Sequence, residues 1–127
     1  MVTNPYAYYQ KTQIETADRG KLLLMLYDGA YRHIRLSREA LNNKDLKEAN
    51  KSLQHTQKIV LELMSSLDMD SGELARNLLR LYEYMHYMLV QANIKKDASY
   101  LDQVEDMLLD LREAWKQALT AENKTTG

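Results

Sequence analysis

The sequence has no cysteine and no phenylalanine, and it has only one proline and four glycines in 127 residues. Without cysteine the chain has no disulfide, no thiolate metal ligand and no cysteine nucleophile, which suits a reducing compartment such as the cytoplasm. Helix-breaking residues are scarce, whereas Leu, Met, Ala, Lys, Glu and Gln, which favour helices, are abundant. The composition therefore predicts an all-α fold.

Strong net charge and long apolar runs are also absent. A formal net charge of -1 gives no electrostatic reason to expect nucleic acid or an anionic membrane as a partner. No apolar run reaches the roughly 18 residues that a membrane span needs, and the N-terminus lacks the pattern of a secretory signal. We therefore expect no nucleic-acid binding and no membrane insertion, and a cytoplasmic location.

Motifs that carry catalysis are missing as well. There is no Gly-x-Ser-x-Gly elbow and no glycine-rich phosphate loop. Helical bundles that bind two metal ions use two Glu-x-x-His pairs, but Glu83 to His86 is the only such pair in this chain. We therefore predict no catalytic residue, no metal site, no cofactor and no enzyme, with His86 on a solvent-facing side of its helix and a metal-dependent bundle enzyme as a remote alternative.

Apolar periodicity predicts helices over about 19–41, 46–66, 74–93 and 98–121, joined by short polar segments. Long helices with short connections pack most simply as an antiparallel four-helix bundle. We expect one domain over 18–121, an N-terminal segment over 1–17 that is extended or forms a short helix, and a frayed tail over 122–127. The N-terminal segment is unusually aromatic, with Tyr6, Tyr8 and Tyr9.

Capping residues mark the expected helix starts. Asp45 with Glu48, and Asp70 with Glu73, each have the spacing of a capping box, in which the two side chains satisfy each other's backbone amides. The first helix is predicted to be capped by Asp18 and the last by Asp97.

The most informative segment is 22–31, because Leu22 to Leu26 are all large and apolar and would cover nearly every face of a helix. A surface helix needs only one apolar stripe, so this segment needs a second covering surface. A dimer face, a buried central helix and a binding site for another molecule all fit this pattern. Gly29 costs roughly 0.5–1 kcal/mol against Ala in a helix interior and could admit another backbone, while Asp28 is expected to pair with Arg32. An ordinary surface ion pair beside a tolerated glycine is an equal alternative.

Tyrosine occurs nine times and methionine seven times. Tyrosine suits surfaces that are wet in one state and covered in another, and methionine repacks around helical ligands. In the third predicted helix Tyr82 shares a face with Met85 and Leu89. This face fits a bundle core and a binding groove equally well.

Several blocks, in order, resemble the flagellin-specific secretion chaperones of the FliS family over nearly the whole chain. They are Tyr9-Gln10, the segment from Leu24 to Ala30, Ser66-Leu67-Asp68-Met69, Leu81-Tyr82-Glu83-Tyr84-Met85, Ala92-Asn93 and Leu111-Arg112-Glu113-Ala114-Trp115. The resemblance implies an antiparallel four-helix bundle that binds the C-terminal segment of flagellin, prevents its premature polymerisation and aids export through the flagellar type III apparatus. It also implies that 1–17 covers part of the client groove until the client displaces it.

The residues expected to bind this client are Tyr9, Leu24, Tyr27, Asp28, Gly29, Leu67, Leu78, Leu81, Tyr82, Met85, Leu89 and Asn93. Export-gate proteins or a co-chaperone are further partners that the resemblance suggests. The alternative is a non-catalytic helical adaptor or regulatory protein for another partner, which self-associates as a homodimer by exchanging a helix or the N-terminal segment.

Overall fold

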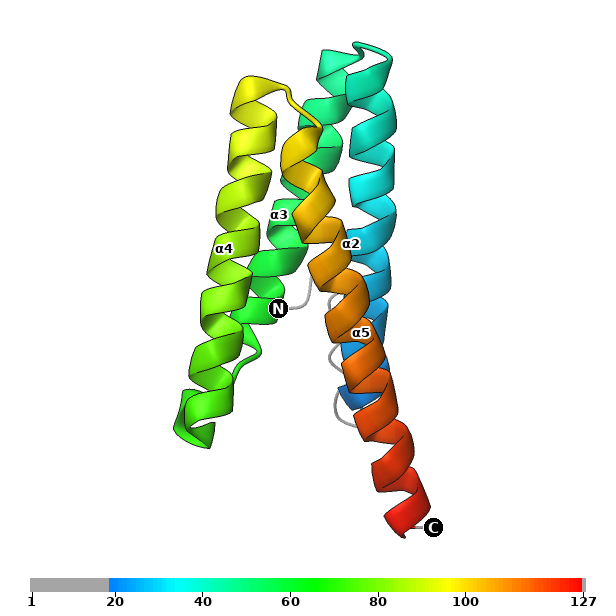
Figure 1. The fold of residues 1–127 in the computed structure, drawn as a ribbon, viewed down its shortest axis with the longest axis vertical. Helices are drawn as coiled ribbons and strands as arrows, with labels where there is room; N and C mark the ends of the chain where they lie inside the picture. The colour runs from blue at the N-terminus through cyan, green and yellow to red at the C-terminus, as the bar shows by residue number, and fades with distance from the viewer. Residues whose placement is uncertain (1–18, 127) are drawn as a thin grey trace, which may run out of the picture.

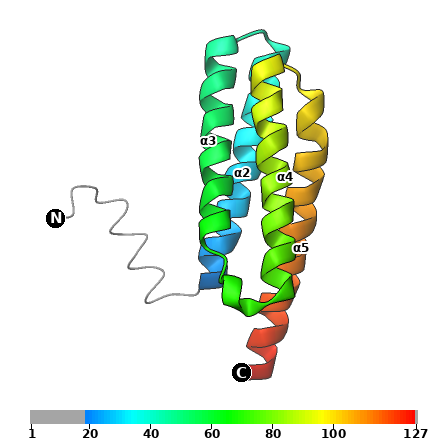
Figure 2. The same ribbon diagram turned by 90° about the vertical axis from the view of Figure 1, so that its left-hand side faces the viewer.

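The computed structural model describes residues 19–126, with side chains described as far as residue 121. Its elements are α2 (Arg19–Asn42), α3 (Leu46–Ser65), the short 3-10 helix η1 (Met69–Ser71), α4 (Glu73–Lys95) and α5 (Ser99–Thr126). Four long helices run alternately up and down the molecule (Figures 1 and 2). The predicted all-α, four-helix architecture is confirmed. The segment 1–17, Tyr9 and the expected cap Asp18 lie outside the described residues.

Each long helix packs against two others. Helix α2 contacts α3 and α5, and α4 likewise contacts α3 and α5, so α2 and α4 lie diagonally across the bundle. Neighbours in sequence are thus neighbours in space, as short connections require. Between α2 and α5, the guanidinium of Arg38 donates to the carboxylates of Asp102 (2.6 Å) and Glu105 (2.7 Å).

The core runs along the bundle axis and takes side chains from all four helices. Its largest fully buried members are Tyr27, Ile34, Leu53, Leu63, Tyr82, Met85, Leu89, Leu101 and Leu108. The hydroxyl of Thr56, the one polar interruption in the α3 stripe, donates to the carbonyl of Ser52, which satisfies it inside the core. Leu46 and Leu74 belong to apolar stripes in the sequence but are exposed, because each lies in the first turn of its helix.

The capping predictions have mixed outcomes. The Asp45 carboxylate accepts a hydrogen bond from the backbone N–H of Glu48, as predicted. The Asp70–Glu73 box is wrong, because Asp70 lies in η1 and the N-cap of α4 is Gly72, at φ 87°. Asp68 instead accepts from the backbone N–H of Asp70 and turns the chain into η1. Asp97 accepts from the backbone N–H of Ser99 at the start of α5, and this bond lowers its pKa.

Helices α4 and α5 lie close together near their connection and diverge toward the opposite end of the bundle (Figure 1). Helix α5 continues through Thr126, past the end of its apolar periodicity at about 121, where the sequence predicts a frayed tail. The sequence continues there with residues that favour helix, among them Ala121, Glu122 and Lys124, which accounts for this backbone conformation. The divergence leaves one end of the bundle open, and this end carries part of the candidate site.

Candidate functional site

A groove runs between α2 and α3 along the N-terminal half of α2. We call it the α2/α3 groove, and its volume is about 500 Å³. Its apolar lining combines Leu22, Met25 and Leu26 of α2 with Ile59 of α3. Met25 is 57% exposed, whereas Tyr27 and Ala30 of the same helix are fully buried in the core. The α2/α3 groove therefore contains an apolar strip that a second chain can cover, beside charged and histidine side chains.

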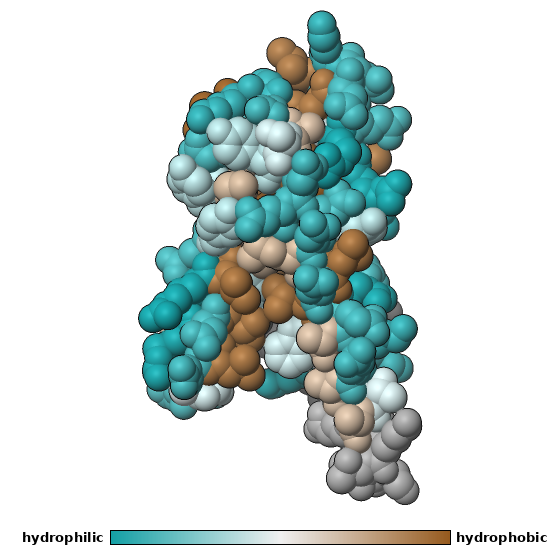
Figure 3. Space-filling view, in the orientation of Figure 1, coloured by the Kyte–Doolittle hydropathy of each residue, from teal (hydrophilic) through white to brown (hydrophobic). Residues whose placement is uncertain are grey.

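A second hollow, which we call the open-end groove, lies where α4 and α5 diverge, with a volume of about 220 Å³. Figure 3 shows hydrophobic side chains gathered in this hollow between the lower parts of the two helices. Its rim includes Leu74, which is 63% exposed, and Asp68 is the only charged residue that lines it among those that the structure describes. The lining residues are Leu23, Ser66, Leu67, Asp68, Ser71, Leu74, Ala75, Leu78, Tyr82 and Trp115.

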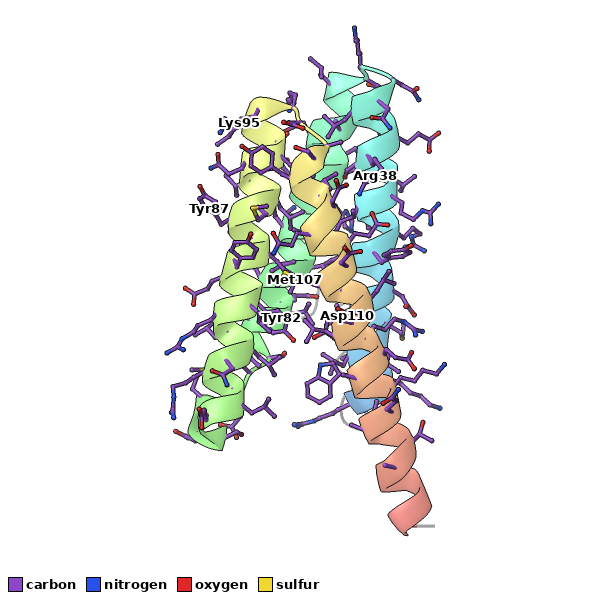
Figure 4. All side chains as sticks on the ribbon, in the orientation of Figure 1. Arg38, Tyr82, Tyr87, Lys95, Met107 and Asp110 are labelled. Carbon is purple, nitrogen blue, oxygen red and sulfur yellow. The ribbon has the colours of Figure 1, made fainter. Side chains whose placement is uncertain are left out.

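The inner end of the open-end groove rests on a buried polar cluster of Tyr27, Tyr82 and Trp115. The hydroxyls of Tyr27 and Tyr82 are 2.5 Å apart, and the Trp115 indole N–H donates to the Tyr27 hydroxyl at 3.1 Å. Figure 4 shows Tyr82 on the side of α4 that faces α5. Burial raises the pKa of both tyrosines, so both stay neutral at physiological pH. The cluster fixes α2, α4 and α5 relative to one another at the base of the groove.

Asp28 pairs across the bundle and not along its own helix. Its carboxylate accepts hydrogen bonds from Nε and Nη2 of Arg112 on α5. The expected pair with Arg32 is therefore wrong, because Arg112 offers a planar two-donor fork from the neighbouring helix. This leaves Arg32 on the α2/α3 groove with no ion-pair partner among the described residues.

Gly29 also lines the α2/α3 groove. A Cβ atom built at this position would lie 3.5 Å from Cδ1 of Ile59, which is ordinary van der Waals contact. Alanine would therefore fit, and the fold itself does not need glycine here. Since glycine costs stability in a helix interior, its lack of a side chain is consistent with space kept for a partner.

The residues expected to bind the client fall into four groups. Asp28 and Gly29 lie at the α2/α3 groove, and Leu67, Leu78 and Tyr82 line the open-end groove. Tyr27, Met85 and Leu89 are fully buried in the core, where no partner reaches them in this conformation. Leu24, Leu81 and Asn93 line neither groove. Tyr9 lies outside the described residues.

Two of these remaining residues have clear structural surroundings. The Asn93 side chain donates to Asn50 of α3 at 2.8 Å and accepts from Lys96, far from the open end. Leu24 is half-buried and shares a helix face with Gly20 and Asp28, both of which face α5. The apolar run of α2 thus serves three surfaces, namely the α2/α3 groove, the open-end groove and the packing against α5.

Several groove residues were missed in the sequence analysis, including Met25, Ile59 and Leu74. Met25 is part of the continuous apolar run, and that run was the signal that could have identified it. Ile59 gave a weaker signal, because it begins the apolar run Ile59-Val60-Leu61, which does not by itself show which of the three residues faces a partner.

Within residues 19–126, no three His, Cys, Asp or Glu side chains lie close enough together to hold a metal ion. Glu83 is exposed and His86 is half-buried on α4. No helix in the described part of the chain combines the length and apolarity needed to span a membrane.

Comparison with known proteins identifies the family. The family model described as "Flagellar protein FliS" matches residues 2–122. A "Flagellar secretion chaperone FliS" of Bacillus subtilis is 42% identical over 97% of this chain and 92% of its own length. The Salmonella typhimurium protein of the same name is 35% identical over 84% and 81%. A solved structure, "Crystal structure of flagellar chaperone from bacteria", has a TM-score of 0.79 at 21% identity, covers 93% of this chain and 99% of its own, and supports the fold. The chain belongs to the FliS family of flagellar proteins.

Proposed function

We propose that this flagellar secretion chaperone binds the C-terminal segment of flagellin, with the α2/α3 groove and the open-end groove as its binding surfaces. The observation that carries the proposal is the pair of apolar grooves beside the N-terminal half of α2, in a chain of this family. The proposed contacts at the α2/α3 groove are Met25, Gly29 and Ile59. Those at the open-end groove are Leu67, Leu74, Leu78 and Trp115, which lie over the buried Tyr82.

The shape of the grooves supports a helical client. An amphipathic helix binds by laying one apolar face along an open groove, whereas a small molecule needs an enclosed pocket. Leu22 and Leu26 line one groove while Leu23 lines the other, so a single client chain that crosses α2 can occupy both. A disordered segment that folds on binding is suited to wrapping around the bundle in this way.

The proposed consequence is that flagellin stays unassembled until export. Apolar surface that drives subunit association would be buried against the chaperone, and the non-catalytic complex would travel through the cytoplasm to the flagellar export apparatus. Export-gate proteins or a co-chaperone are proposed as further partners.

We further propose that residues 1–17 cover part of the grooves before the client arrives. Tyr6, Tyr8 and Tyr9 lie outside the described residues, and their sequence supplies large amphipathic side chains. Deletion of residues 1–14 is then expected to increase self-association and to change client affinity, as measured by analytical ultracentrifugation and titration calorimetry. Unchanged values for both would contradict the covering role.

The direct test of client binding is a titration with a synthetic flagellin C-terminal segment. We expect a 1:1 complex and a gain in helical circular dichroism, because the segment folds as it binds. Absence of binding would contradict the proposal and would favour a helical adaptor for another partner.

A further inference from the structure

The charges along the α2/α3 groove distinguish it from the open-end groove. Arg32 of α2 and Lys58 of α3 both line it, and neither forms an ion pair among the described residues. Its acidic lining residues are Asp28, which is already paired with Arg112, and Glu62. The α2/α3 groove thus offers unpaired positive charge beside its apolar lining.

Two histidines meet across the same groove. The rings of His33 and His55 are stacked, with centroids 4.0 Å apart and an interplanar angle of 23°. Nδ1 of His33 is buried and has no hydrogen-bond partner among the described residues. Burial, then His55, then Arg32 lower the pKa of His33, so His33 is largely uncharged at neutral pH. The stack therefore keeps hydrogen-bonding capacity that the free protein leaves unused.

We infer that the α2/α3 groove selects an acidic amphipathic stretch of the client, whose carboxylates face Arg32, Lys58 and the His33–His55 pair while its apolar residues cover Met25 and Ile59. The inference rests on the proposed function and adds the chemistry of the bound segment. The open-end groove, with Asp68 as its only charged lining residue, takes an apolar stretch instead. The two grooves thus divide the client by charge.

The histidines give this recognition a pH dependence of known sign. The charged groups that line the α2/α3 groove with the pair are Asp28 and Arg32 on α2, and Lys58 and Glu62 on α3, with Arg112 of α5 held by Asp28. A client carboxylate beside the pair favours the imidazolium form and raises the histidine pKa on binding. Binding is therefore expected to be roughly 3–10-fold tighter at pH 6 than at pH 8. The client carboxylates stay ionised over this whole pH range, so they do not contribute to the difference.

The test compares two flagellin C-terminal peptides on the full chain, one natural and one with every Asp and Glu replaced by Asn and Gln. We expect the amide peptide to bind roughly 3–10-fold more weakly. The Arg32→Gln/Lys58→Gln variant should lose most of this discrimination. The charge-matched control Arg76→Gln/Arg80→Gln on α4 should retain it. The His33→Gln/His55→Gln variant should lose the pH dependence, whereas His86→Gln should keep it.

Each outcome has a defined meaning, with folding of every variant checked by circular dichroism. Equal binding of the two peptides to the unmodified chain would overturn the inference and leave the proposed function intact. The Arg32→Gln/Lys58→Gln and Arg76→Gln/Arg80→Gln variants could also lose the discrimination between the two peptides to the same extent. That result would overturn the inference, because the net charge of the protein alone would then explain the effect. Absence of binding by either peptide would overturn the proposed function, and the inference with it.

Discussion

Substitution of Gly29 is expected to have opposite effects on the stability of the protein and on its affinity for the client. Gly29→Ala is expected to raise the free energy of unfolding by about 0.5–1 kcal/mol, because Ala is the better helix former and its Cβ fits beside Ile59. The same methyl group narrows the α2/α3 groove, so client affinity should fall. Urea unfolding and calorimetric titration measure the two effects. A variant that gains stability with no loss of affinity would show that the client does not approach Gly29.

Removal of a tyrosine hydroxyl from the Tyr27–Tyr82–Trp115 cluster should lower stability, whereas removal of an exposed tyrosine hydroxyl should not. Tyr27→Phe removes the hydroxyl that accepts from the Trp115 indole and bonds to Tyr82, which leaves two buried polar groups unpaired. The expected cost is about 1–3 kcal/mol in urea unfolding. The matched control is Tyr87→Phe, because Tyr87 is 57% exposed on the outer side of α4 (Figure 4), and its cost should stay below about 0.5 kcal/mol. Similar values for the two variants would contradict the role of the cluster.

The same tyrosines predict an alkaline transition. Burial raises the pKa of Tyr27 and Tyr82 above the ordinary value of 10.0, so the folded protein holds protons that the unfolded chain gives up at high pH. Their contribution is fully present below pH 10 and is lost as the pH rises above it, by about 1.4 kcal/mol per pH unit for each group. Between pH 9 and 11, the free energy of unfolding should fall less steeply with pH in the Tyr27→Phe/Tyr82→Phe variant than in the unmodified chain. Equal slopes would contradict this assignment.

The helix termini allow a paired test of capping. Asp45 accepts a hydrogen bond at the start of α3, whereas Asp70 lies within η1 and caps no helix. Asp45→Ala should cost about 0.5–2 kcal/mol in thermal or urea unfolding, and Asp70→Ala should cost much less. An equal loss in both would indicate general charge effects and not capping.

The helices were well predicted because their cause is local. Apolar periodicity and Asp45 place α3 within a residue of its observed bounds, and the stripes of α2 and α4 place those helices within one and two residues of theirs. The α4 cap was missed because Gly72 adopts a left-handed φ that only the surrounding turn specifies. The Asp28 partner was missed for a related reason, since an i,i+4 neighbour is visible in the sequence and Arg112 of another helix is not.

The residues that line the two proposed binding grooves were predicted less completely than the helices, because these grooves depend on how the whole bundle assembles. Tyr82, Met85 and Leu89 share one face, as predicted, but the bundle turns that face inward and buries it. The apolar run from Leu22 to Leu26 is divided among three surfaces, and that division depends on where α3 and α5 lie beside α2. Periodicity alone does not reveal which of two apolar faces meets the core.

The central claim is that the two grooves form the client site. Its most direct test is the affinity of the flagellin C-terminal segment for Met25→Glu and Leu74→Glu, which place a charge in the α2/α3 groove and the open-end groove at exposed positions that tolerate it. The control is Ile94→Glu, because Ile94 is 70% exposed on α4 and lines neither groove. We predict that each groove variant weakens binding at least about tenfold, from a lost buried apolar contact and a desolvated charge, while Ile94→Glu binds as the unmodified chain does. Unchanged affinity in both groove variants would contradict the account.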